Sequence, residues 1–402
     1  MRILIGLTYF RPHRSGLTIY VERLANALAA RGHHVTVLTS LYDRSLPSHE
    51  THDGVEIVRL PVLMRISKGV IMPTLPFMAW KLIQTADVIN LHVPQLDAAP
   101  LSVLSRIQGK PVVLTYHCDL KLPEGLVHTV ANSVSDMANR LAAKLSQVIV
   151  TNTTDYAKHS IFLRRYLNKV QVIPPPVELP AITMAERDTF RKKYKIQPGD
   201  RVIGMAARLA TEKGVEYLVE ALPAVLDVIP HARVFFVGQH KDVIAEERYA
   251  DRLAPMITRL GSHWSFLGIL PVKDFVAFLY ESEVLVLPST NSTESFGMVQ
   301  IESMTCGTPV IASDLPGVRQ PILTTGMGQI IPVADSASLA QAIIYQLRNT
   351  TDYHASSETI AASYAPDTTA RQYEQLFKTV LRLESYPNDE TDEQPISSTH
   401  IQ

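Results

Sequence analysis

Cysteine is scarce in this sequence, and long apolar runs are missing from it. The two cysteines, Cys118 and Cys306, are too few for a disulfide framework and do not share a metal-ligand spacing. No stretch reaches the roughly eighteen uninterrupted apolar residues of a membrane-spanning helix, and the opening apolar run is too short for a signal peptide. These absences predict a cytoplasmic protein in a reducing compartment.

Charge of one sign is not in excess overall, but it is uneven along the chain. The net charge is -1, whereas residues 1–174 hold 19 Lys and Arg against 11 Asp and Glu. This basic half also carries the apolar stretch PVLMRISKGVIMPTLPFMAW and the cations Lys144, Lys158, Arg164 and Arg165. Peripheral association with the anionic inner face of a membrane and an ordinary solvated surface both remain open. No nucleic-acid partner is expected.

Short apolar runs alternate with amphipathic, helical stretches along the chain. A first set comprises RILIGLT, HVTVLTS, VEIVRLP, DVINLHV, PVVLTYH and QVIVTN. After VQVIPPPVELP a second set follows, comprising RVIGMAAR, RVFFVGQ, WSFLGIL, VLVLPS, PVIAS and GQIIPV. Such alternation is typical of a parallel sheet wrapped by helices. The sequence therefore predicts two α/β, doubly wound Rossmann-like domains.

Proline marks the boundary between these domains. Residues 174–176 are three consecutive prolines, which cannot lie inside a sheet or a helix, so a connector is expected at about 174–186. We therefore assign an N-terminal domain to residues 1–175 and a C-terminal domain to residues 176–365. A closing helix is expected over 366–384, and the polar, acidic residues 385–402 are expected to be disordered. Two such domains direct the carboxyl ends of their sheets toward a shared central cleft.

Anion-binding groups follow the first strand of each predicted domain. The dinucleotide fingerprint of three spaced glycines is absent, so a nicotinamide cofactor is not supported. Gly16 instead opens the first helix, where it lets backbone N–H groups approach an anion or merely tightens a turn. In GMAARLATEKG, Arg208 and Lys213 lie five positions apart on a loop that faces the cleft. Lys213 opposes the dipole of the next helix unless an anion is near, so the pair is interpreted as a diphosphate site rather than a solvated surface pair.

Two carboxylates, Glu294 and Glu302, flank a Phe-Gly-Met step in TESFGMVQIESMTCGTP. On a single helix, eight residues would separate them by about 12 Å, farther than the carboxyls of a hydrolytic dyad. A better geometry places Glu294 on the loop after VLVLPS and Glu302 on a helix that opens at Gly297 or Met298. The carboxylates can then accept hydrogen bonds from the hydroxyls at either end of one ligand.

At this point the motifs resemble those of a known family. ESFGMVQIESMTCGTPVIAS is similar to the E-x7-E segment of family-four retaining glycosyltransferases, which have the two-domain GT-B fold. GMAARLATEKG, the Ser15-Gly16 loop, VIPPPVE and FLGILPVKD stand where the other motifs of that family stand. The resemblance spans residues 1–383. It implies an enzyme that transfers a sugar, with retention, from a nucleotide diphosphate sugar to an acceptor that is a glycan, a glycolipid or a small molecule.

The resemblance also implies residue roles. Arg208 and Lys213 would bind the donor diphosphate, Glu302 the ribose and Glu294 the transferred sugar. Backbone N–H groups at three positions would help to hold sugar and phosphate, namely Phe296, Gly297 and Met298, and Gly16 would close over the diphosphate. His117 would border the sugar and the acceptor, with Asp119 as a further acceptor-side candidate. The catalytic set is thus His117, Arg208, Lys213 and Glu294; no metal and no cofactor are expected, and no Asp-x-Asp site occurs.

The sequence departs from the family pattern in three ways, and three alternatives stay open. Ser15 and Thr18 replace a glycine and a glutamate of the first loop, and Pro175-Pro176 replaces Asn-Gly at the connector. A nucleotide-sugar 2-epimerase of the same fold would bind the same diphosphate and ribose. A non-catalytic nucleotide-sugar-binding subunit is the alternative from another class. For His117, a purely structural role is the alternative.

Overall fold

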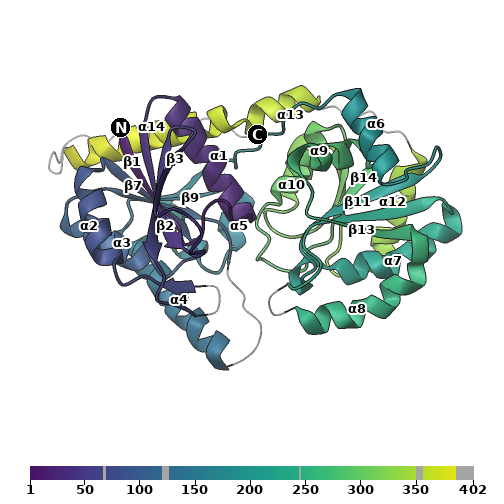
Figure 1. Ribbon diagram of the computed structural model, residues 1–402, viewed down its shortest axis with the longest axis horizontal. Helices are drawn as coiled ribbons and strands as arrows, with labels where there is room; N and C mark the ends of the chain where they lie inside the picture. The colour runs from purple at the N-terminus through teal and green to yellow at the C-terminus, as the bar shows by residue number, and fades with distance from the viewer. Residues whose placement is uncertain (67–68, 120–125, 244–245, 350–355, 386–402) are drawn as a thin grey trace.

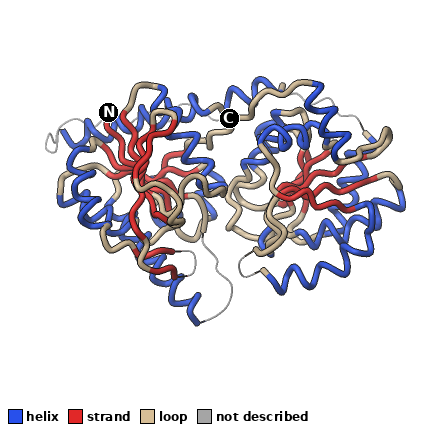
Figure 2. Tube along the Cα trace, in the orientation of Figure 1, coloured by secondary structure: helices blue, strands red, loops and turns tan. Residues whose placement is uncertain are grey.

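The computed structural model describes residues 1–66, 69–119, 126–243, 246–349 and 356–385. The chain forms two lobes, and each lobe has a sheet at its centre with helices on both faces (Figures 1 and 2). Of the predicted acidic tail, residues 386–402 lie outside the described residues. The predicted α/β architecture is confirmed.

The first lobe is built on a sheet in the order β10-β9-β8-β7-β1-β2-β4-β3. Neighbouring strands are parallel except for β3, which runs antiparallel to β4. The strands are β1 (Arg2–Gly6), β2 (His34–Leu41), β3 (His49–His52), β4 (Val55–Pro61), β7 (Val88–Val93), β8 (Val112–Tyr116), β9 (Val148–Thr151) and β10 (Val170–Val172). A separate hairpin joins β5 (Met64–Ile66) and β6 (Gly69–Ile71). The helices are α1 (Gly16–Ala30), α2 (Leu75–Thr85), α3 (Ala98–Ile107), α4 (Leu126–Leu145) and α5 (Thr154–His159).

The second lobe is built on a fully parallel sheet in the order β13-β12-β11-β14-β15-β16. Its strands are β11 (Arg201–Ala206), β12 (Ala232–Val237), β13 (Trp264–Gly268), β14 (Val284–Leu287), β15 (Val310–Ser313) and β16 (Gly328–Ile331). Its helices are α6 (Met184–Lys193), α7 (Val215–Val228), α8 (Glu247–Leu260), α9 (Val272–Glu281), α10 (Met298–Thr305), α11 (Gln320–Thr325), α12 (Ser336–Arg348) and α13 (Ser357–Tyr364). Each face of each sheet carries its own cluster of buried apolar residues, because parallel strands covered on both sides are apolar at nearly every position.

All of the apolar runs quoted from the sequence contain a strand of one of the two sheets, so those predictions are confirmed. The sequence did not reveal β3, whose residues HETH are polar, or the β5–β6 hairpin. It also did not identify VQV as a strand, whereas these residues form β10 at the edge of the first sheet. The connector therefore begins after Val172.

After α13, the helix α14 (Pro366–Ser385) runs along the top of the first lobe in Figure 1. The chain thus returns to the first lobe, where apolar side chains of α14 join the buried cluster that α1 forms with the sheet. Tyr373 of α14 is fully buried there, and its hydroxyl lies 2.9 Å from that of Tyr20 on α1 and 2.9 Å from Oγ1 of Thr115 on β8. The end of the chain thus completes the core of the first domain.

Candidate active site

The loop between β14 and α10 carries the two glutamates. Gly297 caps α10 with a φ of 77°, and a Cβ there would lie 2.5 Å from Leu287 Cδ2, so only glycine fits this turn. Gln300 fixes the loop from inside, since its side-chain amide donates to the carbonyls of Phe296 (2.7 Å) and Val318 (2.9 Å). Glu294 lies on the loop and Glu302 within the helix, so the predicted placement of both is confirmed.

Lys213 and Glu294 are brought together by a close approach of two loops. Lys213 ends a short 3₁₀ turn (Thr211–Lys213), and Gly214 follows with a φ of 62°. A Cβ at Gly214 would lie 2.1 Å from the carbonyl oxygen of Pro288, which follows β14. Because glycine permits this contact, Lys213 Nζ reaches Glu294 Oε2 at 2.6 Å, with both side chains mostly buried. A cation from one motif is thus paired with a carboxylate of another.

Arg208 lies at the outer side of the same loop. Its guanidinium donates to Glu212 at 2.8 Å, and its side chain is 46% exposed. Burial lowers the pKa of His13, on the β1–α1 loop of the first domain, and the positive charge of Arg208 lowers it further. Arg208 therefore acts electrostatically on the first domain across the boundary, with its guanidinium accessible to an anion.

The β1–α1 loop explains two departures from the family pattern. Ser15 is the N-cap of α1: its hydroxyl accepts from the Thr18 N–H (3.2 Å), and the Thr18 hydroxyl accepts from the Ser15 N–H (2.7 Å). Serine and threonine therefore form a reciprocal capping box that fixes the start of the helix. A Cβ on Gly16 would lie 3.8 Å from Cε of Met298, so the starts of α1 and α10 are close.

Glu302 is engaged by the first domain. Arg23 of α1 donates from Nη2 to Glu302 Oε1 at 2.8 Å, and it also donates to the connector carbonyls of Pro176 (3.3 Å) and Glu178 (2.9 Å). The side chains of Arg23 and Glu302 are only 16% and 10% exposed. Arg23 of α1 thus joins the first domain to the connector and, through Glu302, to the second domain. The binding of ribose by Glu302 stays a prediction.

His117 follows β8 and is part of a buried polar chain. Its Nε2 lies 2.9 Å from Nδ1 of His92 on β7, and Nε2 of His92 lies 2.9 Å from Oδ1 of Asn90. The two imidazoles stack with ring centroids 5.2 Å apart, and Tyr20 meets the His117 ring edge-on. Burial lowers the pKa of His117 to about 4, so the ring is neutral near pH 7.

Asp119 accepts hydrogen bonds on both carboxylate oxygens. Oδ1 accepts from Tyr116 (2.8 Å) and Ser160 (2.6 Å), and Oδ2 accepts from the N–H of Ile161 (3.1 Å). The carboxylate therefore ties the segment after β8 to the end of α5. Its predicted contact with an acceptor stays a prediction.

Two residues at the start of α5 join the domains. The Tyr156 hydroxyl accepts from the Asp119 N–H at 2.6 Å and donates to the Ser292 carbonyl at 3.0 Å, which links the loop after His117 to the loop of Glu294.

Beside Tyr156, the Asp155 carboxylate accepts hydrogen bonds from Nε (2.9 Å) and Nη2 (2.7 Å) of Arg319 and from the N–H of Gly317 (2.8 Å). Burial alone would raise the pKa of Asp155, but these hydrogen bonds hold it below its usual value.

Sequence reasoning missed these interdomain residues and the partners of His117. Charged residues such as Arg23, Asp155 and Arg319 belong to no sequence pattern that predicts a partner in another domain. Asn90 and His92 did give a signal, because they are polar residues two positions apart in the otherwise apolar strand VINLHV. Such residues share one face of a strand and, when buried, must be hydrogen-bonded to each other or to their neighbours.

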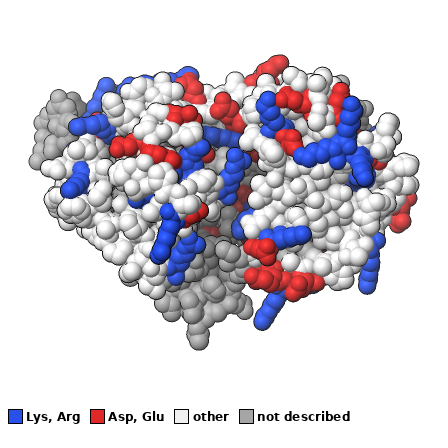
Figure 3. Space-filling view, in the orientation of Figure 1, with Lys and Arg blue, Asp and Glu red and all other residues white. Residues whose placement is uncertain are grey.

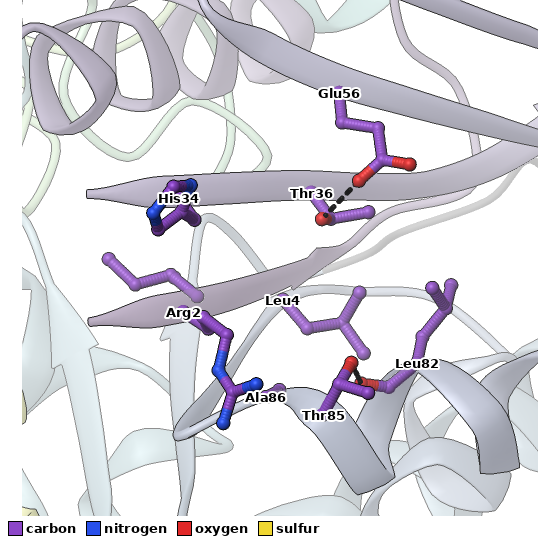
Figure 4. Close-up of a pocket in the computed structure, with 9 residues that line it drawn as sticks. Arg2, Leu4, His34, Thr36, Glu56, Leu82, Thr85 and Ala86 are labelled. Atoms are coloured by element: carbon purple, nitrogen blue, oxygen red, sulfur yellow. Dashed lines mark hydrogen bonds between the residues drawn. The ribbon is translucent and has the colours of Figure 1, made fainter. Parts of the chain in front are cut away.

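The surface is hollowed where the two lobes meet, and Lys and Arg side chains lie on both sides of the hollow (Figure 3). A depression of about 290 Å³ elsewhere is lined by Arg2, His34, Thr36, Glu56 and neighbours (Figure 4). Arg2 and His34 begin β1 and β2, so this depression lies at the amino edge of the first sheet, opposite the loops described above. It belongs to no predicted site.

The residues that the structure describes contain no group of three or more His, Cys, Asp or Glu side chains arranged to hold a metal ion. Metal independence nevertheless stays a prediction. In the same part of the chain, no helix combines the length and the apolar character needed to cross a membrane.

Comparison with known proteins identifies the family. Residues 186–362 match the family of glycosyl transferases group 1, and residues 15–176 match the glycosyl transferase 4-like domain. The phosphatidyl-myo-inositol mannosyltransferase of Mycobacterium leprae is 26% identical over 353 residues, covering 87% of this chain and 88% of that protein. The D-inositol 3-phosphate glycosyltransferase of Pseudarthrobacter chlorophenolicus is 26% identical over 356 residues, covering 81% and 80%.

A solved structure agrees in fold. Anabaena HepE in complex with UDP superposes with a TM-score of 0.74 at 19% identity, covering 94% of this chain and all of that one. The two family matches together span both domains: the first-domain match includes Gly16, and the second-domain match includes Lys213 and Glu294. The chain is an enzyme that belongs to the family-four, group 1 glycosyltransferases and has the GT-B fold.

Proposed function

We propose that this enzyme transfers a hexosyl group from a nucleotide diphosphate sugar to a hydroxyl of its acceptor, with retention at the anomeric carbon. The observation that carries the proposal is the ion pair of Lys213 with Glu294, at 2.6 Å, beside the start of α10. A diphosphate near Lys213 and a sugar near Glu294 would then be adjacent, as in a nucleotide-sugar donor. The nearby guanidinium of Arg208 supplies a second cation for the diphosphate.

The proposed step is a front-face displacement. The bond between the anomeric carbon and the phosphate oxygen breaks while the acceptor oxygen bonds to the same carbon on the same face. The acceptor proton passes to the leaving phosphate oxygen, so no carboxylate nucleophile is needed. Lys213, Arg208 and the N-terminus of α10 would stabilise the negative charge that grows on the diphosphate. No metal is required for this charge stabilisation.

For the acceptor we propose a polyol that is linked to a lipid or carries a phosphate. Two similar proteins are named for transfer to phosphatidyl-myo-inositol and to D-inositol 3-phosphate. The first domain exposes large apolar side chains around the β5–β6 hairpin and α2, among them Leu63 (71%), Phe77 (63%) and Trp80 (43%). Arg65 and Lys81 accompany them, with Lys81 Nζ 4.2 Å from the Phe77 ring centroid. An apolar surface with a basic fringe favours peripheral binding to an anionic membrane.

Nucleotide release from UDP-, GDP- and ADP-sugars tests the donor proposal. Wild type and Glu302→Ala are compared without added metal. Slow release from one donor, lost in the variant, would support the donor class and the ribose role of Glu302. Formation of an isomeric sugar without any acceptor would instead indicate an epimerase. A thermal shift with a nucleotide sugar but no release from any donor would indicate a non-catalytic binding subunit.

Co-sedimentation with liposomes tests the membrane proposal. Binding should rise with the fraction of anionic lipid and fall in Phe77→Glu. The matched control is Leu323→Glu, because Leu323 is similarly exposed (61%) but belongs to the second domain. Binding that does not depend on anionic lipid, or that both variants weaken equally, would contradict this proposal.

A further inference from the structure

The polar chain behind His117 can be oriented unambiguously, starting from Asn90. Asn90 is fully buried, and its Nδ2 lies 3.1 Å from the Val113 carbonyl oxygen and 3.0 Å from Thr115 Oγ1. A carbonyl oxygen can only accept a hydrogen bond, so the amide group that faces it must be the NH₂. The Asn90 oxygen Oδ1 therefore faces His92, and it too can only accept. His92 must carry a proton on Nε2.

The second step fixes the other nitrogen of His92. This residue is fully buried, and burial together with the neighbouring His117 lowers its pKa well below the usual value, so the ring is neutral. A neutral imidazole with a proton on Nε2 has an unprotonated Nδ1, which is an acceptor. That acceptor lies 2.9 Å from Nε2 of His117. Nε2 of His117 must then be the donor.

We propose that Asn90 and His92 hold His117 as the tautomer protonated on Nε2, so that Nδ1 of His117 presents a lone pair to a hydroxyl of the bound substrates. The ring follows β8 at the carboxyl edge of the first sheet and is partly exposed, next to the segment that Tyr156 joins to the loop of Glu294. In this state His117 accepts a hydrogen bond from a sugar or acceptor hydroxyl. It does not donate to the diphosphate.

Asn90 and His92 are thus positioning residues that act through His117. Their strand is apolar apart from these two side chains, and both polar groups point to the same face of the sheet. Only the last part of the inference, the contact with substrate, rests on the proposed function. The tautomer itself is a property of the free enzyme and can be measured without any donor.

The direct test is two-bond ¹H–¹⁵N NMR of the full-length protein labelled with ¹⁵N-histidine, near neutral pH. His117 and His92 should both show a protonated Nε2 and an unprotonated Nδ1. His263 is the internal control for the opposite tautomer, because its Nδ1 lies 2.9 Å from the Ala232 carbonyl oxygen and must donate to it. A protonated Nδ1 on His117 would overturn the proposal whatever the activity.

Asn90→Asp tests the hydrogen-bonded chain from Asn90 through His92 to His117, because it should reverse the direction of donation between His92 and His117. A carboxylate at this position would hold a second proton on His92, whose Nδ1 would then donate to His117 and move the His117 proton to Nδ1. We expect the His117 tautomer to invert and kcat to fall roughly tenfold, the size of one lost hydrogen bond, with the donor KM little changed. His92→Phe removes the hydrogen bond between His92 and His117 and should leave His117 as a mixture of tautomers.

The outcomes separate the two proposals. If Asn90→Asp inverts the His117 tautomer but leaves kcat unchanged, the claim that the Nδ1 lone pair faces a substrate is overturned. If His117 is protonated on Nε2 in a protein that transfers no sugar, the role of Asn90 and His92 is supported and the proposed function is contradicted. Thermal unfolding of each variant, read beside the NMR signal of His263, shows whether a lost tautomer signal comes from a lost fold.

Discussion

Lys213 and Glu294 meet at 2.6 Å although they are 81 positions apart and belong to different motifs. Each is held by its own glycine turn: Gly214 lets the lysine loop approach Pro288, and Gly297 turns the glutamate loop into α10. The ion pair keeps the carboxylate and the ammonium group in fixed positions before a donor arrives. Preorganisation of this kind is what electrostatic stabilisation of a transition state requires.

The first prediction concerns this pair. Lys213→Ala should lower kcat by roughly 100-fold to 1,000-fold, because it removes one preorganised charge from the developing diphosphate. The matched control is Lys193→Ala: Lys193 forms an ion pair of the same length, 2.6 Å, with Asp274 on the outer surface. Steady-state nucleotide release should be unchanged in the control. Equal activity in both variants would contradict the role of Lys213.

The second prediction concerns Tyr156. Tyr156→Phe keeps the buried ring but removes the hydroxyl that joins the Asp119 N–H to the Ser292 carbonyl. We expect kcat for transfer to fall roughly tenfold, since the loops of His117 and Glu294 lose their hydrogen-bonded register. Tyr345→Phe, on an exposed ring of the second domain, serves as the control. Donor affinity measured by calorimetry should change little, and a loss confined to donor binding would contradict this interpretation.

The third prediction concerns Arg23 and Glu302. Arg23→Met leaves a mostly buried carboxylate without its cation, which should lower the free energy of unfolding on the order of 3 kcal/mol. Glu302→Gln added to this variant should restore part of the loss, because no charge is then left unpaired. Thermal unfolding with nucleotide extends the test. If Glu302 binds ribose, nucleotide should raise the Tm of Arg23→Met by more than that of wild type.

The fourth prediction is a pH dependence. Burial raises the pKa of Asp97 from 3.8 to about 6, although Thr8 donates a hydrogen bond to the carboxylate. Between pH 3.8 and about 6, the folded state therefore keeps a proton that the unfolded state has released. The free energy of unfolding falls as pH rises through this window. Asp97→Asn removes the effect. The variant should gain stability over wild type from about pH 4 upward, reaching on the order of 3 kcal/mol above about pH 7.

Urea unfolding at several pH values measures this gain. Asp188→Asn, a change at an exposed carboxylate of α6, is the control and should shift stability by no more than about 0.5 kcal/mol at any pH. A gain in Asp97→Asn that does not grow with pH would show that the pKa of Asp97 is the same in the folded and unfolded states, which contradicts the prediction.

The pattern of apolar residues was sufficient to predict both sheets and the loop and helix positions of Glu294 and Glu302. The Phe-Gly-Met step was sufficient to predict that a helix opens at Gly297 or Met298. The sequence pattern was not sufficient for β3, because HETH has no apolar alternation and pairs only with its neighbour β4. It was also not sufficient for Asp119, whose two oxygens are engaged by residues 116, 160 and 161.

By itself, the sequence determined most strands of the two sheets and the helices between them, because burial imposes a period on apolar residues that can be read without coordinates. It also determined which loops carry glycines and charges that can hold a phosphate. Only the tertiary structure decided which polar groups meet. Arg23 with Glu302, Arg319 with Asp155 and His92 with His117 are pairs set by how strands and domains pack, and hydrogen bonds depend on distances that no residue pattern encodes.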